Sequence, residues 1–276
     1  MNRLNARRVI VTGAAGTIGR ALCRTLTAAG AQVIGLDLAT PTDGPVPVLP
    51  CDLTDAAQVK AAVTTAIDRL GGLDLLVNNA GIGGPAPAEL PPDAVVRRQL
   101  EVNLLAAWST TAAALPALEA SRGRVVFIAS RMAVLALPLA AAYGVSKRAL
   151  VAYADALRLE VGTHVGVSVV YPSMIASPIH DSTAAAGLSL DGVSRYEPVE
   201  GVVAAVVRAA TARRPPANLA TTRRGRLELA VARHFPSLAR RMVTRTVAGR
   251  LKAGAFDGSP LAAGLRRRQD RQEETR

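Results

Sequence analysis

The chain has few of the residues that make covalent or metal cross-links. Its 276 residues include two cysteines, Cys23 and Cys51, and three histidines without metal-ligand spacing, so we expect neither a disulfide framework nor a metal site. No apolar run approaches the ~18 residues of a membrane span, and the first one, residues 9–11, is too short for a signal-peptide core. These absences predict a soluble protein of the reducing cytoplasm.

Acidic residues are scarce at one end of the chain. Residues 1–212 hold 17 Lys+Arg against 16 Asp+Glu, whereas residues 213–276 hold 16 against 5 and carry most of the net charge of +12. Such asymmetry suggests an anionic partner, although a solvated basic face is the simpler alternative. Nucleic acid is not favoured, because Phe235 and Phe256 are the only aromatic residues there that could stack on bases.

Short β-branched runs alternate with helical patterns along residues 1–222. This alternation predicts βαβ units and a parallel sheet with helices on both faces. We therefore predict an α/β fold of the Rossmann type, a doubly wound parallel sheet in three α/β/α layers. The predicted strands are 8–13, 32–38, 46–49, 73–81, 122–130, 166–172 and 217–222, and the predicted helices are 17–30, 52–72, 199–212 and the stretch around Tyr143.

The pattern loosens after Pro172. Residues 176–197 have few large apolar groups and predict a loop or short mobile helices that close over a site. Residues 223–276 form a basic C-terminal extension, with helical spacing over 227–251 that Pro236 interrupts, and we expect residues 258–276 to be frayed or disordered.

The first predicted turn between a strand and a helix, TGAAGTIG at residues 12–19, has the pattern of a phosphate-binding loop. Gly13, Gly16 and Gly19 allow a tight turn, close approach of the backbone to a pyrophosphate and close packing of the helix. Thr17 and Ile18 begin that helix, whose N–H groups attract phosphate. A glycine-rich turn can also be purely structural, so the residues that follow matter.

An acidic residue, Asp37, ends the second predicted strand, at a distance from the glycine-rich turn that suits dinucleotide binding. A carboxylate there can accept hydrogen bonds from the adenosine ribose and repels a 2′-phosphate. No arginine follows it, so NAD is favoured over NADP. The alternative is that Asp37 is only a turn residue at the end of a strand.

A tyrosine and a lysine stand one helical turn apart in AAYGVSK, residues 141–147. In a helix this spacing places Tyr143 and Lys147 on one face, either as ordinary packing or for acid–base chemistry. Free tyrosine has a pKa of ~10, and a lysine ammonium nearby would lower that value.

TGAAGTIG (12–19), NNAG (78–81), Asn103, Ser130 and YGVSK (143–147) together resemble the short-chain dehydrogenase/reductase family, in its compact branch, over residues 7–212. Ser130 stands at a strand end and precedes Tyr143 by the same spacing as the catalytic serine of that family. The resemblance implies an enzyme that transfers hydride between a nicotinamide cofactor and an alcohol or ketone. A non-catalytic, NAD-sensing protein of the same fold is the alternative.

The resemblance also assigns roles to residues. It implies that Tyr143 is the general acid/base, that Lys147 holds the nicotinamide ribose, and that Ser130 bonds the substrate oxygen. Asn103 would carry a water-linked proton path to Lys147, although asparagine often bonds backbone locally. The candidate cofactor-binding residues are Gly13, Gly16, Thr17, Ile18, Gly19, Asp37, Asp52, Leu53, Asn79, Ala80, Gly81, Tyr143, Lys147, Pro172, Ile175 and Ser177.

Two of these residues have local alternatives. Asp52 resembles the adenine-contacting acid of the family, but it can equally act as a helix cap beside Thr54. Ser130 could be a turn residue at the end of its strand. Met132, Tyr153, His180 and Asp181 border the same region, and we expect core packing or solvation for them.

The apolar content of 176–197, with Leu135 and Leu137, suggests a hydrophobic substrate, for example a steroid- or terpenoid-like one. The family commonly forms homodimers or homotetramers, which we expect here. In 227–251 the apolar residues Leu238, Met242, Val243, Val247 and Leu251 fall near one helix face. That face predicts docking on the chain's own domain or a partner subunit, with peripheral contact to an anionic membrane as the alternative.

Overall fold

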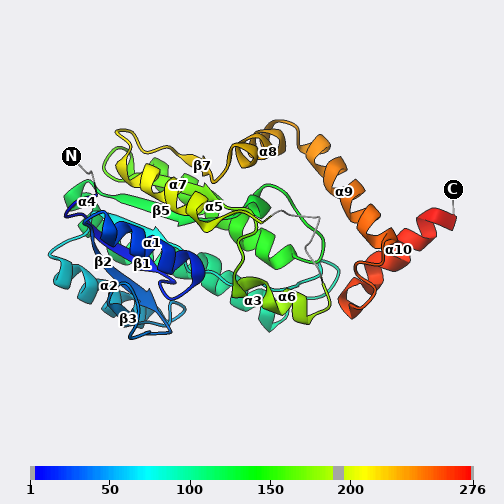
Figure 1. Ribbon diagram of the computed structural model, residues 1–276, viewed down its shortest axis with the longest axis horizontal. Helices are drawn as coiled ribbons and strands as arrows, with labels where there is room; N and C mark the ends of the chain where they lie inside the picture. Colours follow the sequence, from blue (N-terminus) through cyan, green and yellow to red (C-terminus); the bar gives the residue numbers. More distant parts are fainter. Residues whose placement is uncertain (1–3, 189–195, 275–276) are drawn as a thin grey trace.

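The structure, a computed structural model that describes residues 4–188 and 196–274, is built around a seven-stranded parallel sheet (Figure 1). The strand order is β3-β2-β1-β4-β5-β6-β7. The chain first adds strands on one side of β1 and then on the other, so the switch point lies between β1 and β4. Doubly wound sheets bind ligands at this switch point. The strands are β1 Arg8–Thr12, β2 Gln32–Asp37, β3 Val48–Pro50, β4 Leu75–Asn78, β5 Arg124–Ile128, β6 Gly166–Tyr171 and β7 Asn218–Ala220.

Helices cover both faces of the sheet. Side chains alternate along β1, so that Ile10 packs with α2, α4 and α5 on one face while Val9 and Val11 pack with α1 and α7 on the other. This arrangement confirms the predicted doubly wound fold. The helices are α1 Thr17–Ala28, α2 Ala56–Leu70, α3 Ala94–Leu100, α4 Ala106–Ser121, α5 Ala141–Val161, α6 Asp181–Ala185, α7 Val199–Thr211, α8 Arg223–His234, α9 Pro236–Lys252 and α10 Ala263–Glu274.

Helix α2 shows why these segments begin and end where they do. The Asp55 carboxylate accepts the N–H groups of Ala57 and Gln58 at 2.9 and 3.1 Å, which caps the helix. Gly71, with φ of +71°, ends it in the left-handed conformation that favours glycine.

The sequence patterns missed the helices of residues 94–121. Helix α4 is rich in alanine and apolar on most sides, so it has no amphipathic stripe to indicate a helix. It continues α3 through a π-helical turn, Glu101–Leu105, which contains Asn103. Such turns are rare in proteins, and those that occur are often at functional sites.

The C-terminal extension is helical to near its end. Pro236 separates α8 from α9, as its position predicts, and becomes the first residue of the second helix. Where fraying was expected, residues 260–262 form a 3-10 turn and residues 263–274 form α10. The expectation fails because Phe256 and Ala262 are buried against Leu188, a tertiary contact that composition does not reveal. In Figure 1 the extension leaves the sheet after β7 and ends in α10.

The predicted lid segment holds two short helical pieces, a 3-10 turn at Pro178–His180 and α6. Residues 189–195 of that segment lie outside the described residues. Across the described part of the chain, none of the helices has the length and apolar character needed to cross a membrane.

Candidate active site

The glycine-rich loop is clamped to the end of β4. The Asn79 amide donates to the carbonyl oxygens of Thr12 and Gly13 at 2.9 and 3.0 Å. The Thr12 hydroxyl accepts the N–H groups of Asn79 and Ala80 at 3.0 and 3.1 Å. Gly13 has φ of +64°, and a Cβ there would lie 2.8 Å from the Cα of Ala80. Glycine is therefore required where the two strand ends meet.

The loop ends at the start of α1. Gly16 is the N-cap residue and provides no side-chain cap, so the first N–H groups of the helix are left for an anion. Gly19 does not line the cleft described below, because it packs against the loop, where a Cβ would overlap the carbonyl oxygen of Gly13. This position thus serves helix packing, one of the three uses that the motif predicts.

Asp37 stands at the end of β2, beside the loop. Its two carboxylate oxygens accept the N–H groups of Ala15 and Ala39 at 2.9 and 3.1 Å. Each oxygen keeps a second lone pair, so the carboxylate can also accept hydroxyl groups of a ribose.

These residues border one large cleft, of about 970 Å³, across the carboxyl ends of the strands. Its volume and its glycine-lined cradle fit a dinucleotide. Apart from Gly19 and Asn103, every candidate site residue lines it, namely Gly13, Gly16, Thr17, Ile18, Asp37, Asp52, Leu53, Asn79, Ala80, Gly81, Ser130, Tyr143, Lys147, Pro172, Ile175 and Ser177.

Lys147 is a buried cation on α5. Its Nζ donates to the carbonyl oxygen of Ile128 at 3.0 Å and lies 5.9 Å from the centroid of the Tyr143 ring. Burial lowers the pKa of Lys147 to about 8. A Cβ on Gly81 would come within 3.0 Å of Nζ, so glycine leaves the room that the ammonium occupies.

Tyr143 is half-buried and faces Ser130. Burial raises the pKa of the Tyr143 phenol, and its hydrogen bond with Ser130 lowers it in part. Ser130 begins the turn at Arg131–Ala133, where its Oγ accepts the N–H of Met132 at 3.1 Å. The strand and helix thus bring together two hydroxyl groups that are not neighbours in the sequence.

Asn103 lies behind the cleft and is buried. Its Oδ1 accepts the N–H of Ile82 at 2.8 Å, and its Nδ2 donates to the carbonyl oxygen of Ile82 and to Ser146 Oγ at 3.0 and 2.9 Å. The local backbone bonding considered from the sequence is therefore present. Asn103 also approaches Lys147, because a Cβ on Gly81 would lie 3.2 Å from its Oδ1.

Asp52 bonds Thr54 locally but is not the helix cap that one alternative predicts, because Asp55 is the N-cap residue of α2. Asp52 Oδ1 accepts the N–H and hydroxyl of Thr54 at 2.9 and 2.7 Å, and these bonds, with help from Arg98, hold the pKa of Asp52 below its usual range. It forms a local turn, while Asp55 caps the helix. It also lines the cleft.

Several cleft residues were not predicted from the sequence. Arg20 lies one turn into α1, a position that a phosphate site could have suggested, and its Nε donates to the carbonyl oxygen of Ala15 at 3.0 Å. Arg98 reaches the cleft from α3, with its Nη2 3.7 Å from Asp52. No local pattern marks it.

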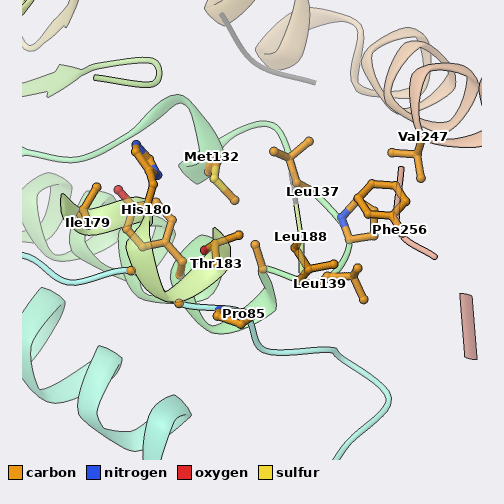
Figure 2. Close-up of a pocket in the computed structure, with 15 residues that line it drawn as sticks. Pro85, Met132, Leu137, Leu139, Ile179, His180, Thr183, Leu188, Val247 and Phe256 are labelled. Carbon is orange, nitrogen blue, oxygen red and sulfur yellow. The ribbon is translucent and has the colours of Figure 1, made fainter. Parts of the chain in front are cut away.

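A narrow apolar chamber adjoins the cleft at Tyr143. Figure 2 shows the residues that line the chamber. Met132 and His180, for which packing or solvation was expected, both line it, whereas Tyr153 stacks on Trp108 in the helical layer. Leu137 lines it and Leu135 does not. The lining residues are Gly83, Gly84, Pro85, Met132, Leu137, Pro138, Leu139, Ala140, Tyr143, Ile179, His180, Thr183, Leu188, Val247 and Phe256.

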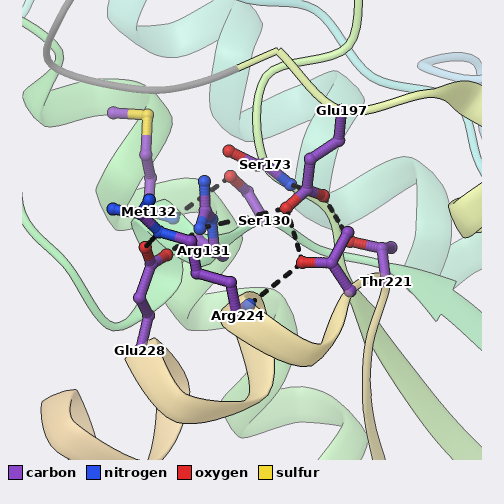
Figure 3. A network of polar contacts seen from close by, with 10 residues as sticks. Ser130, Arg131, Met132, Ser173, Glu197, Thr221, Arg224 and Glu228 are labelled. Atoms are coloured by element: carbon purple, nitrogen blue, oxygen red, sulfur yellow. Dashed lines mark hydrogen bonds and ion pairs between the residues drawn. The ribbon is translucent and has the colours of Figure 1, made fainter.

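A buried arginine directly follows Ser130. The guanidinium of Arg131, with its side chain 11% exposed, pairs with Glu228 of α8 and lies 3.9 Å from Glu197 (Figure 3). Burial lowers the pKa of Arg131, and the Glu197 carboxylate offsets part of that effect. The turn that carries Ser130 is therefore tied to the C-terminal extension.

Glu197 joins three further segments to this network. Its Oε2 accepts the N–H of Ser173 at 3.2 Å and the hydroxyl of Thr221, and its Oε1 accepts the hydroxyl of Thr222 at 3.0 Å. The segment after β6, the end of β7 and the start of α8 thus meet on one carboxylate. Single-sequence patterns give no signal for such a long-range cluster.

We expect Glu197→Gln to lower the thermal midpoint of unfolding by about 4–8 °C. The amide keeps the shape of the side chain but removes the negative charge that Arg131 and three hydrogen-bond donors face. This loss lowers the free energy of unfolding by about 2 kcal/mol. The midpoint of a chain of this size falls by about 2–4 °C for each kcal/mol. Glu200→Gln, at an exposed position of α7, is the matched control. Equal midpoints for the two variants in a calorimetric scan would mean that the network carries no net stability.

Comparison with known proteins agrees with this geometry. The model of the short chain dehydrogenase family matches residues 7–186. The chain belongs to this family. Short-chain dehydrogenases bind a nicotinamide cofactor, and the protein is an oxidoreductase that acts on CH–OH groups. The non-catalytic alternative is not favoured.

Two curated relatives show the range of this similarity. An L-fucose dehydrogenase of Mus musculus is 34% identical over 197 residues, which are 67% of this chain and 71% of the relative. A 1-deoxy-11-beta-hydroxypentalenate dehydrogenase of Streptomyces exfoliatus is 35% identical over 218 residues, 72% of this chain and 79% of the relative.

Solved structures agree on the fold. The ligand-free aldohexose dehydrogenase of Thermoplasma acidophilum has a TM-score of 0.70 at 25% identity and covers 80% of this chain and 94% of its own. A 3-ketoacyl-(acyl-carrier-protein) reductase of Brucella melitensis, complexed with NADH, has a TM-score of 0.69 at 21% identity, over 80% of this chain and 99% of its own. At that identity the second shows the fold alone.

Proposed function

We propose that this short-chain dehydrogenase uses NAD to interconvert a secondary alcohol and a ketone on a hydrophobic small molecule. The observation that carries the proposal is the apolar chamber that adjoins the cofactor cleft at the Tyr143 phenol. A substrate whose reacting carbon lies beside that phenol would place its polar oxygen near Ser130 and its apolar remainder in the chamber.

The cleft residues divide the chemistry. Bound nicotinamide would supply the hydride acceptor for oxidation, or the donor for reduction. Tyr143 Oη takes the proton of the substrate hydroxyl, or returns one to the ketone oxygen, while Ser130 Oγ donates a hydrogen bond to the same oxygen. Lys147, held by the carbonyl oxygen of Ile128, keeps a positive charge beside the phenol and favours its deprotonated form.

Asn103 and the cofactor loop support this arrangement. We propose that Asn103 fixes the loop after β4 to α5 through its bonds with Ile82 and Ser146. Its Oδ1 and Lys147 Nζ both lie close to Gly81, and a proton path would pass between them. Asp37 would accept the adenosine ribose hydroxyls. The start of α1 would hold the phosphates.

The chamber favours a hydrophobic substrate over a sugar. Of its described lining residues, only Tyr143, His180 and Thr183 have polar side chains. The Nε2 of His180 bonds the carbonyl oxygen of Ile175 at 3.1 Å, and burial lowers the pKa of His180, so a neutral ring is expected near pH 7. A sugar would lose hydrogen bonds to water without replacing them, whereas a steroid- or terpenoid-like skeleton would not.

The direct test is formation of reduced nicotinamide with purified protein. NAD and NADP are each mixed with a panel of apolar secondary alcohols, and L-fucose serves as the polar comparison. The proposal predicts turnover of apolar alcohols with NAD and a kcat/KM for L-fucose at least tenfold lower. Turnover of L-fucose above every apolar alcohol would contradict the substrate class, and turnover with NADP alone would contradict the cofactor.

We expect Asp37→Ser to move the cofactor preference toward NADP by about 10- to 100-fold in kcat/KM. The carboxylate repels a 2′-phosphate at short distance, and its removal also costs NAD the hydrogen bonds to the ribose. Asp43→Ser removes the same charge from an exposed position outside the cleft and should leave the preference unchanged. If both variants keep the wild-type ratio of NAD to NADP activity, Asp37 does not select the cofactor.

We also propose that the protein is a homodimer or homotetramer. Exposed apolar side chains lie on α4 and α5, where Trp108 and Val145 are 51% and 57% exposed and Leu159 is 85% exposed. A second copy would cover this surface. The molar mass in solution, measured by light scattering, checks the proposal.

A further inference from the structure

Two residues of the C-terminal extension lie at the far end of the apolar chamber. Val247 comes from α9, and Phe256 follows that helix. In Figure 2 they stand at the end opposite Ile179 and His180, with Leu137, Leu139 and Leu188 between. Both lie beyond residues 7–186, where the family model matches, so the match does not account for this wall.

The side chains of this wall are fixed by packing. Phe256 is 6% exposed and forms an apolar cluster with Leu188, 5% exposed, and the fully buried Ala262, against which Leu139 and Leu251 also pack. Val247 is 7% exposed. Of the residues predicted to form one docking face on 227–251, Val247 therefore turns toward the domain, while Leu238 and Met242 stay 49% and 58% exposed.

Polar contacts fix the backbone of the same region. The guanidinium of Arg266 on α10 donates to the carbonyl oxygens of Phe256 and Ser259, the latter at 3.1 Å. Arg268 pairs with Glu89, in the loop after β4, at 2.6 Å. Glu89 belongs to the dehydrogenase domain, and Glu228 of α8 pairs with Arg131 of that domain, so the extension is attached to the domain both before Val247 and after Phe256.

We infer that Val247 and Phe256 determine substrate specificity, because they close the chamber and limit the length of the apolar group attached to the reacting carbon. The inference rests on the proposed function. The substrate class that fits this closed chamber is an elongated apolar secondary alcohol or ketone, whose oxygen lies at Tyr143 and whose far end contacts Phe256.

A series of straight-chain secondary alcohols measures the chamber directly. With NAD and 2-alkanols from 2-butanol to 2-dodecanol, wild-type kcat/KM should rise about fourfold for each methylene that is buried, until the chain reaches the wall, and then stop rising. Phe256→Ala should extend the rise to longer chains and increase kcat/KM at least tenfold for those beyond the wild-type limit. Val247→Trp should move the limit to shorter chains.

Phe235→Ala is the matched control, since Phe235 lies on the same extension but is 61% exposed. It should keep the wild-type length profile, and Phe256→Leu serves if Phe256→Ala does not fold. Identical profiles for wild type, Val247→Trp and the Phe256 variants would overturn the inference.

A binding measurement separates this inference from the proposed function. The thermal midpoint of each protein is measured with saturating NAD and a 2-alkanone of each length, because bound ligand raises the midpoint without turnover. A length limit that moves in Phe256→Ala and Val247→Trp but not in Phe235→Ala supports the wall even if no alcohol is oxidised. If no alkanone raises any midpoint, the inference is wrong, whatever the enzyme oxidises.

Discussion

Tyr143→Phe should lower kcat for the best apolar alcohol by about 10³-fold or more, and it should leave the Kd for NAD within about threefold. The substitution removes one oxygen and keeps the ring, so the packing at the junction of cleft and chamber is preserved. General acid–base groups contribute about 10²- to 10⁴-fold, and the loss reaches the upper part of this range because no other phenol lines the cleft among the described residues. Stopped-flow or steady-state formation of reduced nicotinamide, with NAD affinity from fluorescence quenching, measures both quantities.

The same helix supplies the control for this variant. Tyr153 also carries a hydroxyl on α5, but its ring stacks on Trp108 with centroids 4.3 Å apart, away from the cleft. Tyr153→Phe should keep kcat within about twofold. Burial raises the pKa of the Tyr143 phenol, so wild-type alcohol oxidation should become faster as the pH rises and more phenolate forms. Tyr143→Phe should lose that pH dependence, and a variant that keeps both its rate and its pH profile would exclude Tyr143 as the base.

The parts of this molecule that depend on local sequence could be predicted. Each expected strand is present, because short apolar runs that alternate with helical patterns are typical of buried parallel strands. Tyr143 and Lys147 lie together because helix geometry fixes their spacing. Asp37 lies beside the glycine loop because parallel strands end on one edge of the sheet. Each of these relations spans one element or two neighbouring ones.

Relations between distant segments could not be predicted. Phe256 reaches the chamber through contacts with Leu188 and Leu139, which are far from it in the sequence, and the segment that follows it, 258–276, was predicted to be frayed. Arg131 follows a strand and has no local sign that it will pair with Glu228. Helix α4 lacks an amphipathic stripe because its exposed face also carries apolar residues, such as Trp108. In the first two cases tertiary packing, not the local sequence, decides the outcome.

Replacing Lys147 should separate stability from activity. Lys147→Met should lower kcat at least about 100-fold, since the ammonium that favours the phenolate is lost. The same variant should unfold at a higher temperature than wild type at pH 7. Burial lowers the pKa of Lys147 from 10.5 to about 8, which corresponds to about 3 kcal/mol of lost stability at any pH below 8. Methionine fills a similar volume without a charge to bury.

The gain is smaller than that cost, because the substitution also leaves the carbonyl oxygen of Ile128 without its hydrogen bond from Nζ. Removing that bond costs about 1–2 kcal/mol, so the net gain is about 1–2 kcal/mol and the midpoint should rise by about 2–8 °C. Lys60→Met, on the exposed face of α2, removes the same charge without relieving burial and should leave the midpoint unchanged.

The pH dependence of this difference identifies its cause. Between pH 8 and about 10.5 the folded wild type loses the Lys147 proton while the unfolded chain still holds it, so the unfolded state binds more protons and wild-type stability rises with pH. The variant has no such group. Its advantage over wild type should therefore shrink from pH 8 upward and be gone near pH 10, as followed by urea unfolding at each pH. An advantage that stays constant from pH 7 to 10 would show that relief of steric packing, not the buried charge, stabilises Lys147→Met.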